Sequence, residues 1–184
     1  MKRFLMAVAL TAVAASPALA DAALKVDTSK SCSFVIKLRP DLAPKHVAQV
    51  TKIAAAGQYD GVVFHRVIDG FMAQTGDVKF GKDGGDLSQA GMGGSDEPNI
   101  PAEFNKEHFK RGTVGMARSN EPDSANSQFF VMFADGGFLD GKYTVFGEVD
   151  AEGMKCVDML TKGDSNNNGS VAKPDKMTKV TVIQ

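Results

Sequence analysis

Residues 64–77 combine residue types and a spacing that could do chemistry. The stretch predicts two short strands joined by an Asp-Gly turn, which is a strong hairpin signal. Side chains alternate between the two faces of a strand, so Arg66, Met72 and Gln74 are expected on the same face. A guanidinium beside a thioether and an amide indicates a binding site on the surface of a sheet.

The arginine has an ordinary interpretation as well. A lone arginine on a strand is usually a solvated edge charge. Here Met72 and Gln74 are its expected neighbours, and Phe130 and Leu139 could supply an apolar floor. A pocket with one fixed cation and apolar walls suits a small apolar ring attached to a peptide carbonyl.

Other catalytic patterns have little support. Ser127 lies in no Gly-x-Ser-x-Gly elbow, and His65 should face away from Arg66, so a structural, hydrogen-bonded histidine is expected. The absence of a Cys-x-x-Cys pair argues against thiol–disulfide exchange. The glycines of residues 91–95 indicate a flexible loop rather than a phosphate cradle. Residues 164–175 imitate a calcium loop, but a strand is expected after them, so ordinary turn material is favoured.

The composition is that of an ordinary globular chain. Hydrophobic residues make up 43% and charged residues 23% of 184 residues, which suits one domain with a sizeable core. The net charge of −1 gives no indication of a nucleic-acid partner or of binding to an acidic membrane surface.

Residues 1–20 have the pattern of a signal peptide. Lys2 and Arg3 precede a short apolar run, and Ala18-Leu19-Ala20 supplies a small-x-small cleavage site. Cleavage there would remove two positive charges and leave residues 21–184 with a net charge of −3. We therefore expect a soluble exported protein, periplasmic in a bacterium, with no membrane anchor.

The two cysteines of the exported chain are Cys32 and Cys156. An oxidising destination makes a disulfide possible, but only the geometry of the fold can decide it. Free buried thiols are the favoured expectation, because cysteine is among the most often buried side chains.

The elements expected along the chain are mostly strands. The helical patterns cover residues 41–59 and 153–161, and residues 79–101 form a long glycine-rich loop. Strands are expected at residues 23–27, 31–38, 111–116, 128–133, 143–149 and 176–183, in addition to the hairpin at 62–77. Many strands, two helices and no βαβ rhythm predict a mainly β protein built as an antiparallel barrel.

Several motifs together resemble one known family. FHRVIDGFMAQTGD at residues 64–77 is similar to the signature of the cyclophilin-type peptidyl-prolyl cis–trans isomerases. The family's further motifs follow in order as IPAEF at 100–104, GTVGMAR at 112–118, SQFF at 127–130 and FLDGKYTVFG at 138–147. The resemblance covers residues 24–184 and implies a closed eight-stranded antiparallel barrel capped by two helices, with the site on its outer face.

The resemblance also implies roles for individual residues. Arg66 would be the catalytic residue, and Gln74 would orient it. The residues that would line the proline pocket are Phe71, Met72, Phe130 and Leu139, and those that would border the peptide groove are Ala117 and Gln128.

Three positions depart from the pattern of many family members. Phe138 stands where a tryptophan is frequent, so weak binding of cyclosporin is expected. Tyr143 replaces a histidine at the pocket edge, and Arg118 replaces an asparagine that binds substrate backbone. Phe138 and Tyr143 are still expected to contact substrate.

Two functions follow from these observations. The first is a prolyl isomerase that acts on proline-containing segments of unfolded or exported proteins, works as a monomer and needs no cofactor or metal. The second is a chaperone module that binds such segments with little turnover. Arg66 and Gln74 favour the enzyme, because a simple binder needs the pocket but not the cation.

Overall fold

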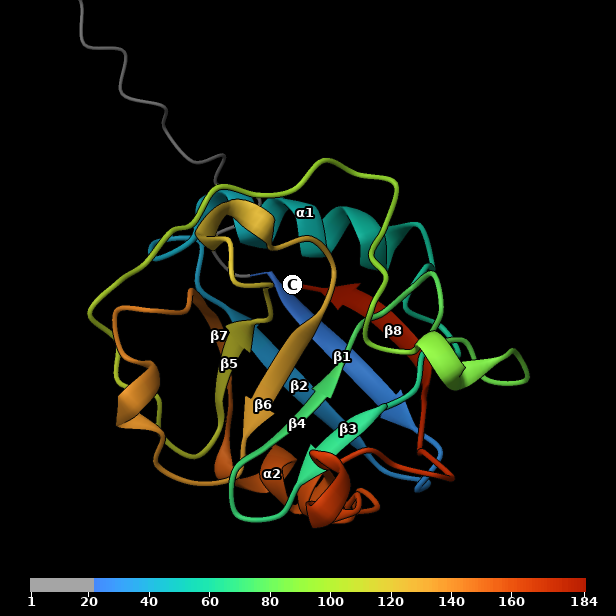
Figure 1. Cartoon of the computed structure of the whole chain (residues 1–184). Coiled ribbons are helices and arrows are strands. Elements are labelled where there is room, and N and C mark those ends of the chain that lie inside the picture. The colour runs from blue at the N-terminus through green and yellow to red at the C-terminus, as the bar shows by residue number, and fades with distance from the viewer. Residues whose placement is uncertain (1–21) are drawn as a thin grey trace, which may run out of the picture.

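The structure is a computed structural model that describes residues 22–184, so the expected signal peptide lies outside the described residues. The described chain forms eight strands and two α-helices (Figure 1). The strands are β1 Ala23–Thr28, β2 Ser33–Leu38, β3 Arg66–Ile68, β4 Met72–Thr75, β5 Thr113–Met116, β6 Phe129–Met132, β7 Val145–Val149 and β8 Met177–Ile183. The helices are α1 Pro44–Ala55 and α2 Ala151–Asp158.

The strands form one antiparallel sheet in the order β3-β4-β6-β5-β7-β2-β1-β8. The sheet curls, so that β4 and β6 lie in front of β1 and β2 in Figure 1. The expected barrel is not closed, because the two end strands, β3 and β8, do not pair. An isolated bridge between Val63 and Lys176 lies just outside these strands. The fold is a curled, open eight-stranded sheet.

The interior of the curl is the main hydrophobic core. β1 and β2 alternate and bury Leu24, Val26, Phe34 and Ile36, while α1 buries Val47, Val50, Ile53 and Ala54 along one stripe. Figure 1 places α1 and α2 at opposite ends of the curled sheet. The two helices therefore cover the ends of the core.

Both helices have different bounds from those expected. α1 begins at Pro44, a residue that suits the first turn of a helix, and its start is bound by a distant carboxylate. Glu103 accepts hydrogen bonds from the backbone N–H groups of Lys45 (3.1 Å) and His46 (3.1 Å). Gly57, with φ +67°, lies just past the helix end. The expected span of residues 41–59 was too long at both ends.

A second apolar cluster lies on the outer face of β4, β6 and β5. Its buried members are Met72, Phe109, Phe130, Met132, Leu139 and Val145. β6 is therefore covered on both faces, with Phe129 and Val131 in the main core and Phe130 and Met132 outside it. This outer cluster is the apolar base of the site.

The expectation of free thiols was wrong. Cys32 and Cys156 form a disulfide, with their Cα atoms 5.7 Å apart. Cys32 lies just before β2 and Cys156 lies within α2, and the two are separated by 124 residues. The packing of α2 against the sheet brings them together, which no local pattern could show.

Across residues 22–184, the helices are all too short or too polar to cross a bilayer.

Candidate active site

The hairpin of β3 and β4 brings the predicted chemical groups onto one surface. Gly70 takes φ +68° in the turn, and the strands pair in the register Arg66 with Gln74 and Ile68 with Met72. Directly opposed residues of an antiparallel pair project from the same face. Arg66, Met72 and Gln74 therefore lie side by side, as the alternation predicted.

The Arg66 guanidinium is half-buried and held on two sides. Nη1 donates to Gln74 Oε1 at 3.2 Å and lies 3.9 Å from Met72 Sδ. Nε donates to the backbone oxygen of Asn168 at 2.9 Å, and Nη2 donates to Asn168 Oδ1 at 2.9 Å. Burial lowers the pKa of the Arg66 guanidinium, but arginine begins so far above neutrality that the group stays charged.

Gln74 is itself fixed by a chain of hydrogen bonds. Its Nε2 donates to Gln128 Oε1 at 3.0 Å, and Gln128 Nε2 donates to the backbone oxygens of Gly91 (2.9 Å) and Gly93 (2.7 Å). The buried carboxylate of Asp77 accepts from the N–H groups of the same two glycines. The glycine-rich loop is therefore fixed, and it orients Gln74 toward Arg66 through Gln128.

A hollow of about 280 Å³ opens beside Arg66. Its lining residues are Arg66, Phe71, Met72, Gln74, Ala117, Arg118, Phe130, Phe138, Leu139 and Tyr143. Gln128 lines the adjoining hollow of about 320 Å³, which shares Gln74, Ala117 and Arg118 with the first. Every site residue expected from the sequence is therefore in one of these two connected hollows.

The apolar floor is built by stacked rings. Phe130 lies 5.8 Å from Phe109 in a stacked pair and 5.9 Å from Tyr143 in an edge-to-face pair, measured between ring centroids. Gly115 makes this arrangement possible, because a Cβ there would lie 2.5 Å from Phe130 Cζ and 2.6 Å from Phe109 Cε1. At the rim, Phe71 contacts Phe138, whose side chain is 64% exposed.

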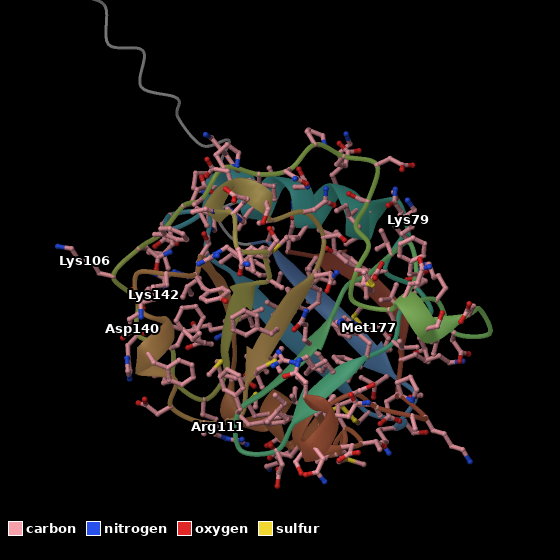
Figure 2. All side chains as sticks on the ribbon, in the orientation of Figure 1. Lys79, Lys106, Arg111, Asp140, Lys142 and Met177 are labelled. Carbon is pink, nitrogen blue, oxygen red and sulfur yellow. A yellow bond between two sulfur atoms is a disulfide. The ribbon has the colours of Figure 1, made fainter. Side chains whose placement is uncertain are left out.

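The 3-10 turn Gly137–Leu139, which forms one wall of the pocket, is held in place by a cluster of charged residues. Asp140 directly follows this wall and lies at one edge of the molecule in Figure 2. Asp140 accepts from the Phe109 N–H at 2.9 Å and is 2.7 Å from His108 Nδ1. Hydrogen bonds to Asp140 and Asp135 raise the pKa of His108. The cluster connects the pocket wall to the segment that supplies Phe109.

Neither His65 nor Ser127 is placed for hydrolysis. Ser127 is buried and donates to the backbone oxygen of Gly76 at 2.7 Å. Both ring nitrogens of His65 are buried without a hydrogen-bond partner among the described residues, and burial lowers its pKa to about 4. The hydrogen bond expected for a structural His65 is therefore not found among the described residues.

Comparison with known proteins identifies the family. Residues 23–182 match the family model described as cyclophilin type peptidyl-prolyl cis-trans isomerase. The chain belongs to this family. A probable peptidyl-prolyl cis-trans isomerase of Brucella suis is 59% identical over 155 residues, which are 83% of this chain and 79% of that protein. A peptidyl-prolyl cis-trans isomerase-like protein of Emericella nidulans is 33% identical over 86% of this chain and 93% of its own length.

Solved cyclophilin structures have the same fold. A cyclophilin from Hirschia baltica superimposes with a TM-score of 0.71 at 28% identity, over 86% of this chain and 73% of that one. A cyclophilin from Cryptosporidium parvum, crystallised in the presence of the dipeptide Ala-Pro, gives a TM-score of 0.73 at 21% identity, over 88% of this chain and 99% of that one. The family match and the curated relatives identify the protein as a peptidyl-prolyl cis–trans isomerase of cyclophilin type.

Arg118, a departure from the common cyclophilin pattern, lies between the two hollows. Its guanidinium donates to the backbone oxygens of Lys142 (2.8 Å) and Ser119 (2.9 Å) and lies 4.5 Å over the Tyr143 ring. Most of its donors are therefore used within the protein. Arg118 covers one side of the cyclophilin pocket and fixes the tyrosine that lines it.

Asn168 is the site residue that sequence reasoning missed. The cluster of Asn and Gly around it was interpreted as turn material, and it does form a 3-10 turn, Ser165–Asn167, capped by Asp164. The Asn-Gly pair at 168–169 signals a left-handed turn but not its partner. Arg66 is 102 residues away in the sequence, so only the fold reveals this contact.

Proposed function

We propose that this isomerase accelerates X-Pro rotation by fixing the proline ring in the apolar pocket while Arg66 stabilises the twisted peptide bond. The observation that carries the proposal is a charged guanidinium held at the mouth of an apolar pocket. Gln74 orients the guanidinium, and Phe130 forms the floor beside it. This geometry provides one cationic donor group for a peptide whose proline ring is buried.

The chemistry requires stabilisation of a conformation and no covalent change. An X-Pro amide rotates slowly because resonance must be lost, at a barrier of ~18–20 kcal/mol. In the twisted transition state the proline nitrogen regains its lone pair and can accept a hydrogen bond. A planar guanidinium with donors in a fixed fork can hold the substrate carbonyl and reach that nitrogen. Only contacts that are stronger in the twisted form raise the rate.

The apolar side chains around the pocket have a complementary role. Phe71, Met72 and Leu139 line it with Phe130 and would hold the proline ring still while the preceding residue turns. Ala117 and Gln128 border the adjoining hollow, where the rest of the peptide would lie. Phe138 and Tyr143 would contact substrate at the rim.

We also propose that the protein is exported to the periplasm as a monomer and acts there on unfolded or newly exported chains. Lys2, Arg3, the apolar run and Ala18–Ala20 form the export pattern. The Cys32–Cys156 disulfide supports an oxidising compartment. Mass spectrometry of the protein from its native host should find Asp21 at the N-terminus. An N-terminal Met1 on the mature protein would contradict export by this signal.

The alternative is a chaperone module that binds proline segments with little turnover. A protease-coupled assay on a short Ala-Pro peptide separates the two, with Arg66→Ala as the test variant. Loss of one strong donor should lower kcat/KM roughly a hundredfold, by analogy with oxyanion-hole donors, and leave the fold intact. Arg66→Lys should recover little, because an ammonium lacks the planar fork.

Phe130→Ala is the contrasting variant in the same assay. It should weaken peptide binding as well as turnover, because it removes the pocket floor. A folded Arg66→Ala protein with near wild-type turnover would refute the catalytic role and favour the binding module.

A further inference from the structure

A distant segment, residues 163–171, lies along the outer edge of β3. Val67 in the middle of β3 donates to Gly169 O at 2.8 Å and accepts from Gly163 N at 2.8 Å. Val171 N donates to His65 O at 3.1 Å. The segment therefore covers the outer edge of β3, whose first residue is Arg66. Backbone hydrogen bonds with His65 and Val67 hold it there.

The local chemistry of this segment directs Asn168 toward Arg66. Asp164 O accepts from Gly169 N at 2.8 Å, and the Asp164 side chain accepts from Asn166 N at 2.9 Å, which closes a compact turn. Asn168 takes the left-handed conformation, with φ 50° and ψ 30°, which asparagine tolerates better than most residues. Gly169 cannot carry a side chain, because a Cβ there would lie 2.4 Å from Ile68 Cγ1.

Most N–H donors of the Arg66 guanidinium are already bonded within the protein. Arginine has five N–H groups. Nε and one hydrogen of Nη2 are bound by the two oxygens of Asn168, and one hydrogen of Nη1 is bound by Gln74 Oε1. One N–H of Nη2 remains for a peptide, and the second N–H of Nη1 meets only the Met72 sulfur, a weak acceptor, at 3.9 Å. Without Asn168, Gln74 would hold the guanidinium only at Nη1, and the guanidinium could rotate about that one hydrogen bond.

We propose that Asn168 is a positioning residue for catalysis, which holds the plane of the Arg66 guanidinium so that the N–H groups of Nη1 and Nη2 not bound by Asn168 or Gln74 face the substrate. The inference rests on the proposed catalytic role of Arg66. Asn168 is absent from the lining of the proline pocket and of the adjoining peptide hollow, and instead lines a third hollow that shares Arg66 and Gln74 with the pocket. Its loss should therefore slow turnover without weakening peptide binding.

The test variant is Asn168→Gly, which removes Oδ1 but tolerates the left-handed backbone and keeps the backbone oxygen. The expected result is a fall in kcat of about tenfold, the scale of one hydrogen bond to a charged group, with KM unchanged. Asn168→Asp keeps an oxygen at the same place and should stay within a few-fold of the wild-type kcat. Asn166→Gly is the matched control, because Asn166 is exposed in the same turn and only its backbone N–H is bonded.

A second measurement reports on the guanidinium directly. In ¹⁵N spectra of the arginine side chains, the Arg66 Nη groups should rotate slowly in the wild-type protein and in Asn168→Asp, and faster in Asn168→Gly. An unchanged kcat in Asn168→Gly, or an equal loss in Asn166→Gly or Asn168→Asp, would overturn the proposal. Arg66→Ala is assayed in parallel: near wild-type turnover there would mean that the proposed function itself has failed, whatever the spectra show.

Discussion

Gly115→Ala should damage the pocket from beneath, although Gly115 does not line it. The new Cβ would lie 2.5 Å from Phe130 Cζ and 2.6 Å from Phe109 Cε1, whereas ordinary contacts begin at 3.4 Å. One or both rings must therefore move by roughly 1 Å. Phe109 is fully buried, but Phe130 borders an open hollow, so Phe130 should move into the pocket.

The cost of this change should appear in both stability and binding. Overpacking of a dense core typically lowers the free energy of unfolding by about 1–3 kcal/mol. If returning the Phe130 ring to its place costs ~1.4 kcal/mol when peptide binds, kcat/KM falls about tenfold. KM should rise, because the displaced Phe130 ring occupies space that the proline ring needs.

The assays are urea unfolding and protease-coupled isomerisation of an Ala-Pro peptide at several peptide concentrations. Gly85→Ala is the control, since Gly85 lies in an exposed loop and a Cβ there would meet only Lys82 O, at 3.2 Å. Lys82 in this exposed loop needs to move by only a few tenths of an ångström, so the control should change both quantities much less than Gly115→Ala does. A Gly115→Ala protein with wild-type stability and kcat/KM would show that the rings yield without cost and that Phe130 is not a constrained floor.

Three further predictions concern the rim, the disulfide and the partly buried His65. Cyclosporin should inhibit weakly, and Phe138→Trp should tighten inhibition by adding an indole N–H at an exposed rim position; unchanged inhibition would place the resistance elsewhere. The free energy of unfolding of the Cys32→Ser/Cys156→Ser double variant should be lower by roughly 2–5 kcal/mol, and a thiol reductant should destabilise the wild-type protein but not the variant. Burial lowers the pKa of His65 from 6.5 to about 4, so the unfolded chain binds the extra proton and stability should fall as the pH drops from 6.5 to 4. His65→Gln should flatten that part of the unfolding free energy measured against pH, and an equal slope in both proteins would contradict the assignment.

The sequence by itself determined the local geometry of the site. An Asp-Gly turn and strand alternation were enough to place Arg66, Met72 and Gln74 on one face, because both signals depend on neighbours in the chain. Phe130 was likewise expected in the apolar floor of the site, and it lies in the outer apolar cluster. The ordered motifs predicted the family, which the comparisons confirmed.

The bounds of α1 were harder to predict, because one of the groups that stabilise its start lies far away in the sequence. The N-terminus of α1 is bound by Glu103, which belongs to a motif 58 residues from Lys45. The residues near Pro44 give no sign of this distant carboxylate. The predicted helix, residues 41–59, therefore included residues at both ends that form turns in the structure.

Only the tertiary structure decided the contacts between distant segments. The packing of α2 against the sheet joined Cys32 to Cys156 across 124 residues, where burial statistics had favoured free thiols. The curl of the sheet stopped short of closure between β3 and β8. Pairing of residues 163–171 with the edge of β3 brought Asn168 to the Arg66 guanidinium, 102 residues away. Turn and strand patterns report on neighbours in the chain, whereas these contacts depend on the shape of the whole folded sheet.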